Sequence, residues 1–303
     1  MSRPQFIKDP KITHLIGGIS SLLKSKKIFL SRKRHIIFLC GGSNKNSARI
    51  KFIKYALQHL PDLTIFLAEN ATKDLISHDN PGFINLSDFE TVVADIADCI
   101  ILFPETPGAI AELGLFSGSS RARKKLLVVN DEQFQSQDSF INRGPIETID
   151  KKSQFRSRVI LDLTGRSPKF SHVKEKLTIL GKLRNRATFS HQNLKDMSRR
   201  EKMFVILEVV NLFRMLSLQE IQEVIEVIFG KLSSGELRNS LSILFAAGYV
   251  KRSGPDEKFF APTNPPHSFF DYEGFLEDVN GLKLQIMDYY QSTDSDRFNL
   301  LGE

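Results

Sequence analysis

The chain has 303 residues, 41% of them hydrophobic, which predicts one large or two ordinary globular domains and excludes bulk disorder. Its two cysteines, Cys40 and Cys99, lie in apolar runs without metal-ligand spacing, which excludes a disulfide framework and predicts no metal site. The net charge of +7 is uneven, because residues 1–34 carry +8 and residues 151–202 carry +11. These basic segments predict contact with a polyanion such as nucleic acid; the alternative is a solvated surface.

The first predicted element is an amphipathic helix over residues 12–24, within a basic N-terminal extension, residues 1–34. Gly and Ser interrupt its apolar part and no convincing cleavage site follows, so we expect no signal peptide. No stretch approaches the roughly 18 apolar residues of a membrane span. We therefore expect a cytoplasmic protein without membrane contact.

Residues 35–165 alternate short apolar runs with helical patterns. The predicted strands are 35–40, 63–68, 99–103, 125–130 and 158–163, and the predicted helices are 47–59, 86–98 and 108–118. This alternation predicts an α/β fold with a parallel sheet flanked by helices, of flavodoxin-like or Rossmann-like type. Ligands bind such sheets beyond the carboxyl ends of the strands. Three loops follow strands at that edge, so we expect them around one crevice: 41–46, 69–72 and 104–108.

The loop after the first strand, Gly-Gly-Ser-Asn-Lys-Asn, is a weak candidate for binding a phosphate or a ribose. Gly41 and Gly42 allow close backbone approach, and Ser43 can hydrogen-bond a sugar. The loop matches neither the dinucleotide fingerprint nor the Walker pattern. The alternative is an ordinary strand-to-helix turn with Asn46 as the helix cap.

Two carboxylates near helix starts are candidate catalytic residues. A helix dipole favours a nearby carboxylate by roughly 0.3–1 kcal/mol, which is one explanation of Glu112. Gly108 and Gly114 leave space around Glu112 beside the expected crevice, which favours a catalytic role instead. Glu90 also has two explanations, because Ser87-x-x-Glu90 matches a capping box and because its carboxylate can orient a ligand.

Residues 166–200 are charged and polar, and we interpret them as a basic linker. Residues 201–303 then form a second domain. Its predicted elements are helices over 201–216, 217–230 and 233–248, a hairpin over 249–263 and a last helix over 273–290. Three helices followed by a hairpin is the element order of a winged helix-turn-helix domain.

In that domain the third helix and the hairpin are the candidate nucleic-acid surface. Arg238 and Asn239 are expected on the outward side of the third helix, and Lys251 and Arg252 on the hairpin. The alternative is a winged helix used only for protein–protein contact. The sequence does not decide between the two.

Several stretches together resemble the effector proteins encoded beside retron reverse transcriptases. They are IFLCGG, FETVVADIADCIILFPETPGAIAELGLFS, KLLVVN and SFINRGPI. The resemblance covers residues 35–165 well and the remainder by domain order. It implies an amino-terminal domain similar to nucleoside deoxyribosyltransferases and a carboxyl-terminal winged helix. The family's aspartates shortly before the nucleophile are absent here, where only Glu105 is present, so this chain departs from enzymes that transfer deoxyribose between bases.

The resemblance also implies roles for single residues. Glu112 matches the nucleophile of a small-x-x-Glu-x-Gly stretch, and Glu90 falls at the place of a carboxylate that orients the base or sugar. The implied substrate contacts are Gly41, Gly42, Ser43, Gly108 and Asn142. Cleavage of an N-glycosidic bond creates positive charge on the sugar, which a carboxylate can stabilise or attack.

The function implied by the resemblance is that of a toxin in retron anti-phage defence, which cleaves the N-glycosidic bond of NAD or a related nucleotide. NAD is then a substrate, and no cofactor is expected. The implied partners are the reverse transcriptase and its branched RNA–DNA product (msDNA), in an assembly that contains a homo-oligomer of this chain. Two alternatives stay open: a DNA-binding regulator whose first domain senses a nucleotide, and a metabolic nucleoside or nucleotide N-glycosidase.

Overall fold

A computed structural model describes residues 6–25, 28–31, 35–70, 86–156, 158–165, 167–182 and 188–301. The chain divides into two compact units. The described parts of residues 32–70 and 85–185 form one, here called the α/β unit. The described parts of residues 1–31 and 186–303 form the other, here called the helical unit.

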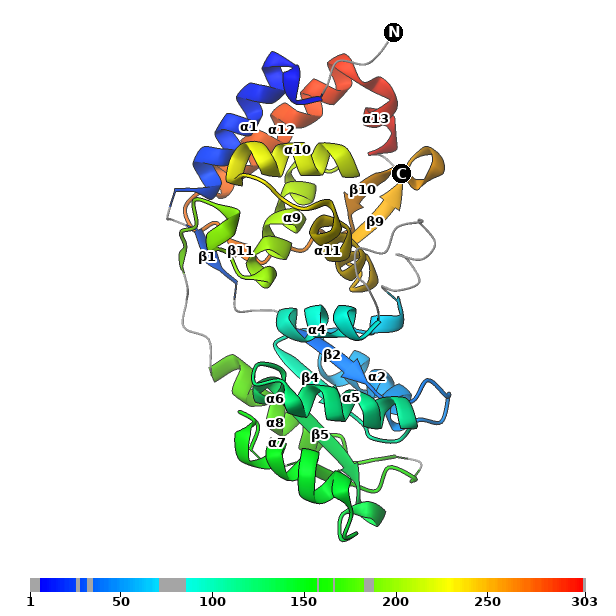
Figure 1. Ribbon diagram of the computed structural model, residues 1–303. Coiled ribbons are helices and arrows are strands. Elements are labelled where there is room, and N and C mark those ends of the chain that lie inside the picture. Colours follow the sequence, from blue (N-terminus) through cyan, green and yellow to red (C-terminus); the bar gives the residue numbers. More distant parts are fainter. Residues whose placement is uncertain are drawn as a thin grey trace. The chain divides into compact units, whose positions relative to one another are not determined.

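The α/β unit is built on a five-stranded parallel sheet (Figure 1). Its strands are β2 (His35–Cys40), β3 (Leu63–Phe66), β4 (Cys99–Leu102), β5 (Leu126–Asp131) and β6 (Val159–Leu161), in the order β3-β2-β4-β5-β6. The strand order reverses between β2 and β4, which pair with Ile37 opposite Cys99. In open sheets of this kind the ligand crevice lies at that reversal, beyond the carboxyl ends of the strands. The predicted parallel sheet flanked by helices is confirmed.

Helices cover both faces of this sheet. They are α2 (Ala48–His59), α4 (Leu86–Ile96), α5 (Pro107–Gly118), α6 (Ala122–Lys125), α7 (Glu147–Lys152) and α8 (Ser171–Lys182). Because successive strand side chains point to opposite faces, Ile37 packs in a cluster with residues of α2 and α8, while the Phe38 ring lies 5.9 Å from the Phe116 ring of α5. Cys40, two residues after Phe38, points to the same face as Phe38.

The linker predicted over residues 166–200 is corrected by helix α8. Phe170, Val173 and Leu177 are buried in the same hydrophobic cluster as Phe52 of α2, and the Phe52 and Phe170 rings are 5.3 Å apart. Phe170, Val173 and Leu177 are three and four positions apart, so they lie on one apolar face of the helix. The many Lys and Arg residues around them led us to interpret the segment as a linker. The α/β unit therefore continues through α8.

The helical unit contains two small sheets and a set of packed helices. Its elements are α1 (Pro10–Leu23), β1 (Ile28–Leu30), β7 (Thr188–Phe189), α9 (Arg199–Phe213), β8 (Leu216–Ser217), α10 (Leu218–Phe229), α11 (Ser234–Ala246), β9 (Val250–Ser253), β10 (Phe259–Pro262), β11 (Phe270–Asp271), α12 (Leu276–Thr293) and α13 (Ser295–Leu300). The sheet orders are β11-β1-β7 and β8-β10-β9. The predicted hairpin is present as β9 and β10, and a capping box of Ser217 and Glu220 begins α10.

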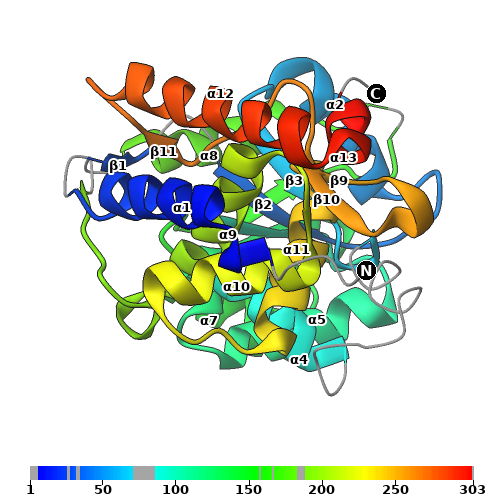
Figure 2. The same cartoon turned by 90° about the horizontal axis from the view of Figure 1, so that it is seen from above.

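The amino-terminal helix α1 packs within the helical unit, beside α12 and against α10 (Figures 1 and 2). Its residues Ile12, Ile16, Ile19 and Leu23 are buried. The predicted helix over 12–24 is confirmed, but it is not a separate extension, because its apolar face is part of the core of this unit. Among the described residues, no helix combines the length and hydropathy needed to cross a bilayer.

Arg297 of α13 joins several elements of the helical unit. Its guanidinium is buried, lies 2.7 Å from Glu220 Oε1 and donates to the carbonyl oxygen of Met215 at 3.3 Å. The same group lies over the rings of Phe6, Phe259 and Tyr290. A buried cation is thus compensated by a carboxylate, a carbonyl and aromatic faces.

Candidate active site

Glu112 and Glu90 come from two helices that begin near the carboxyl edge of the sheet. Thr106 caps α5 by accepting from the N–H of Ala109, which sets Glu112 in the second turn. A helix dipole acts mainly on the first turn, so it does not account for Glu112. Helix α4 begins at Leu86, which puts Ser87 inside the helix, where a capping box has no place. The structural explanations that the sequence offered for both carboxylates are therefore wrong.

The carboxyl groups of Glu90 and Glu112 share a hydrogen bond. Burial, with a further contribution from the charge of Glu112, raises the pKa of Glu90 from 4.5 to about 7. Glu90 is 8% exposed, so its ionised form is poorly hydrated beside a second carboxylate. Below about pH 7 the pair therefore keeps one proton, with Glu90 as the donor and Glu112 as the acceptor.

The pKa of Glu112 is also raised by burial, but less than that of Glu90, so Glu112 is the member of the pair that ionises more readily. Burial raises its pKa, but the Cys40 thiol donates a hydrogen bond to it and the nearby Arg49 guanidinium lowers its pKa. The oxygen Oε2 of Glu112 is buried, and within the described ranges it has no hydrogen-bond partner. An ionised carboxylate with an oxygen left for another molecule can bind or attack an electropositive carbon.

Arg49 and Glu69 complete this cluster, and neither was a candidate from the sequence. The Arg49 Nε donates to the carbonyl oxygen of Gly42 at 2.8 Å, and Nη2 lies 2.6 Å from Glu69 Oε1. Arg49 is buried on the first turn of α2, whereas the Glu69 side chain is 41% exposed. The sequence could have indicated them by their position. Glu69 comes soon after β3, and Arg49 is in the first turn of the helix that follows β2.

The Gly41–Gly42 turn is held by Glu105, the carboxylate that follows β4. Glu105 accepts from the backbone N–H groups of Gly42 at 2.9 Å, Ala48 at 2.7 Å and Arg49 at 3.2 Å. A side chain of this chain thus occupies the anion-binding position at the start of α2. A Cβ on Gly41, whose φ is +149°, would lie 3.0 Å from Arg49 Cβ and 3.1 Å from Glu105 Oε1. The glycines are needed for this packing.

The other predicted substrate contacts lie around the same edge or further along the chain. Ser43 is exposed in the loop, and Ser47, not Asn46, caps α2. Gly108 is exposed one turn before Glu112. The Asn142 amide donates to the carbonyl oxygens of Phe134 at 2.8 Å and Gln137 at 2.9 Å, so it orders the segment after β5.

The nucleic-acid candidates lie in the helical unit, on α11 and the β9–β10 hairpin. Lys251 is exposed, and the Arg252 guanidinium lies over the Phe260 ring at 4.7 Å. Arg238 is partly exposed on α11. Asn239 is 8% exposed, so its predicted outward position is wrong. Helix α11 packs against α9, α10 and β9, which covers more of its circumference than the sequence pattern indicates.

Comparison with known proteins shows one matching protein family and two similar proteins. A family model described as STM3845 retron effector protein matches residues 45–252. An Escherichia coli retron Ec86 protein, described as a candidate ribosyltransferase/DNA-binding protein, is 39% identical over 127 residues, 41% of this chain and 39% of that protein. A retron Ec73 protein of the same species and description is 31% identical over 255 residues, 78% of this chain and 81% of that protein.

Proposed function

Because the chain belongs to the STM3845 retron effector protein family, we propose that it is a toxic effector of a retron anti-phage system. We propose that its reaction is cleavage of the N-glycosidic bond of NAD or a related nucleotide in the cytoplasm. The observation that carries this proposal is the proton-sharing pair of Glu90 and Glu112, with a buried Glu112 oxygen that has no hydrogen-bond partner among the described residues. The word ribosyltransferase in the names of both relatives supports chemistry at C1′ of a ribose.

In the proposed reaction, Glu112 Oε2 faces C1′ of the ribose. As the bond from C1′ to the nicotinamide nitrogen breaks, its electron pair moves to the pyridinium ring, which leaves as neutral nicotinamide. The positive charge that develops on the sugar is stabilised or captured by the Glu112 carboxylate. A water molecule then adds its oxygen to C1′, displaces the Glu112 carboxylate where that has bonded to C1′, and releases a proton to solvent, which gives ADP-ribose. Glu90 orients the sugar, and the leaving group needs no acid.

We propose that the helical unit contains a winged helix-turn-helix domain that contacts nucleic acid. The order α9, α10, α11 and the β9–β10 hairpin supports this assignment, as do the exposed Lys251 and the name DNA-binding of the two relatives. The proposed partners are the retron reverse transcriptase and its branched RNA–DNA product, which hold a homo-oligomer of the chain inactive until infection. The substrate site and this surface belong to different units.

The test is a metabolite measurement in cells that express the chain alone or together with its neighbouring reverse transcriptase and RNA. We expect the chain alone to deplete NAD, or one related nucleotide, and to release the free base. Co-expression of the neighbours is expected to prevent this loss, and the Glu112→Gln chain is expected to cause none. Unchanged nucleotide pools with the folded wild-type chain would refute the proposal.

A further inference from the structure

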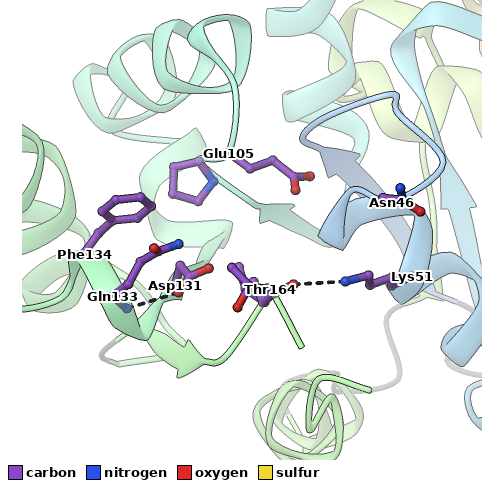
Figure 3. Close-up of a pocket in the computed structure, with 9 residues that line it drawn as sticks. Asn46, Lys51, Glu105, Asp131, Gln133, Phe134 and Thr164 are labelled. Atoms are coloured by element: carbon purple, nitrogen blue, oxygen red, sulfur yellow. Dashed lines mark hydrogen bonds between the residues drawn. The ribbon is translucent and has the colours of Figure 1, made fainter. Parts of the chain in front are cut away.

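A hollow on the carboxyl edge of the same sheet is lined by neither Glu90 nor Glu112. It is a pocket of about 720 Å³, within the range of roughly 300–1,000 Å³ that small-molecule sites occupy. Figure 3 shows Asn46 and Lys51 on one side and Asp131, Gln133 and Phe134 on the other, with Glu105 between them. The pocket therefore lies beyond the ends of β4, β5 and β6, whereas the catalytic pair lies beside the end of β2.

The pocket and the carboxylate pair are neighbours across the Gly41–Gly42 turn. Glu105 lines the pocket and binds the N–H groups of Gly42 and Arg49, and the Arg49 guanidinium acts on Glu112. A Cβ at Gly41 would crowd both Arg49 and Glu105, so the turn packs closely between these two side chains. A ligand with one end at Glu112 and the other in the pocket would cross this turn.

The walls of the pocket fit an uncharged base and a ribose better than a phosphate. Glu105 and Asp131 are acceptors, and Asp131 is only 9% exposed. Lys51 is a wall cation, but its Nζ donates to the carbonyl oxygens of Leu163 at 3.1 Å and Gly165 at 2.9 Å. The carboxylates of Glu105 and Asp131 outnumber the single cation of Lys51, which is already hydrogen-bonded, so the pocket repels an anion. The same carboxylates can accept hydrogen bonds from the two hydroxyls of a ribose.

The same pocket offers groups that suit an aromatic base. The Phe134 ring is 44% exposed at its wall, and the segment that carries Phe134 is fixed by the Asn142 amide. Base–aromatic stacking tolerates any base because each has a π face. The amides of Asn46 and Gln133 can donate to and accept from the edge of such a base.

We propose that this pocket binds the second nucleoside of a dinucleotide substrate, the one whose glycosidic bond is not cut. Asp131 accepts from its ribose hydroxyls, and Phe134 stacks on its base. The inference rests on the proposed function, since it makes a dinucleotide rather than a mononucleotide the preferred substrate of the Glu112 site. It assigns positioning roles to Asp131 and Phe134, which make no contact with the cleaved bond.

The test compares cleavage of NAD with cleavage of nicotinamide mononucleotide by the full-length chain and its variants. Asp131→Asn keeps the size of the side chain and an acceptor for the Gln133 N–H, which Asp131 Oδ1 binds at 3.1 Å. We expect Asp131→Asn and Phe134→Leu each to raise KM for NAD about tenfold, the loss of one good contact, without changing kcat or the KM for the mononucleotide. Asp138→Asn, an exposed site in the same segment, is the matched control.

The outcomes separate this inference from the function on which it rests. If the variants alter both substrates alike, or neither, or if the wild type cleaves both substrates with equal kcat/KM, the pocket does not bind a second nucleoside, while the cleavage reaction stands. If the wild type cleaves neither nucleotide, NAD is not the substrate and this inference fails, whereas the metabolite measurement above decides whether a related nucleotide is cleaved instead. A selective rise in KM for NAD supports both.

Discussion

The two units bury ionisable side chains in opposite ways. In the helical unit the Arg297 guanidinium is 2.7 Å from Glu220 and lies against three aromatic rings, so opposite charges compensate each other. In the α/β unit two carboxyl groups, Glu90 and Glu112, face each other and share a proton. The Arg297 cluster stabilises the packing of several elements. The Glu90–Glu112 pair lowers the free energy of unfolding, and such like-charge pairs are characteristic of active sites.

Breaking the opposite-charge cluster should have the largest effect on stability. Arg297→Met leaves the half-buried Glu220 without its cation, and removing one partner of a buried ion pair costs up to about 3–5 kcal/mol. We expect this loss in the free energy of unfolding, measured with urea at pH 7. Arg121→Met, at a side chain that is 81% exposed, is the control and should cost less than about 1 kcal/mol. Equal unfolding curves for the two variants would contradict the role of Arg297.

Removing the ionisable group of Glu90 from the like-charge pair should raise the free energy of unfolding, whereas Arg297→Met should lower it. The folded-state pKa of Glu90 is raised to about 7 from 4.5, so protonated Glu90 favours folding below pH 4.5 and this contribution is lost as the pH rises through 7. We therefore expect Glu90→Gln to gain stability relative to the wild type between pH 5 and pH 8, by at most about 3 kcal/mol.

The measurement for Glu90→Gln is chemical unfolding at a series of pH values, together with nicotinamide release. We expect lower turnover although the variant is no less stable at pH 8, because Glu90 orients the sugar. Glu175→Gln, an exposed change on α8, controls for the loss of one carboxylate. A stability difference that does not vary with pH would mean that the pKa of Glu90 is not raised in the folded protein.

The smallest expected effect concerns the exposed cations of the helical unit. Each phosphate contact adds roughly −0.9 to the slope of log K against log salt on duplex DNA. Lys251→Glu and Arg238→Glu should each remove one phosphate contact and so make that slope shallower by about 0.9. Neither should change NAD cleavage by the isolated chain. Lys54→Glu, an exposed site on α2, carries the same charge change and should not alter the slope. Equal slopes for all three variants would exclude this surface from nucleic-acid binding.

Local patterns predicted the sheet because its strands are short apolar runs that each form a complete element, such as His35–Cys40. They also made Glu112 and Glu90 candidate site residues, and the family resemblance supplied the catalytic roles that stay to be tested. They did not predict that α1 packs with α10 and α12, because an apolar helix face does not specify its partner. Arg49 was missed because a cation in a first helical turn usually faces solvent, whereas here it bonds the Gly42 carbonyl.

The error at Asn239 has a related cause. The sequence indicates which side of α11 is apolar, but not how far neighbouring elements wrap around it. Asn239 and Ser242 are both buried, although neither is apolar. Polar side chains inside a small domain depend on hydrogen bonds from distant segments, which periodicity does not reveal. The outward positions that remain for testing are Arg238 and Lys251.

The most direct test of the central claim is nicotinamide release from NAD by purified Glu112→Gln, compared with the wild type and Glu175→Gln. The change keeps the size of the Glu112 side chain and removes the charge that meets the developing cation. Loss of such preorganised stabilisation costs on the order of 10² or more in rate. We predict that loss in a variant whose melting temperature is not lowered, with full activity in Glu175→Gln. Wild-type turnover by folded Glu112→Gln would contradict the account.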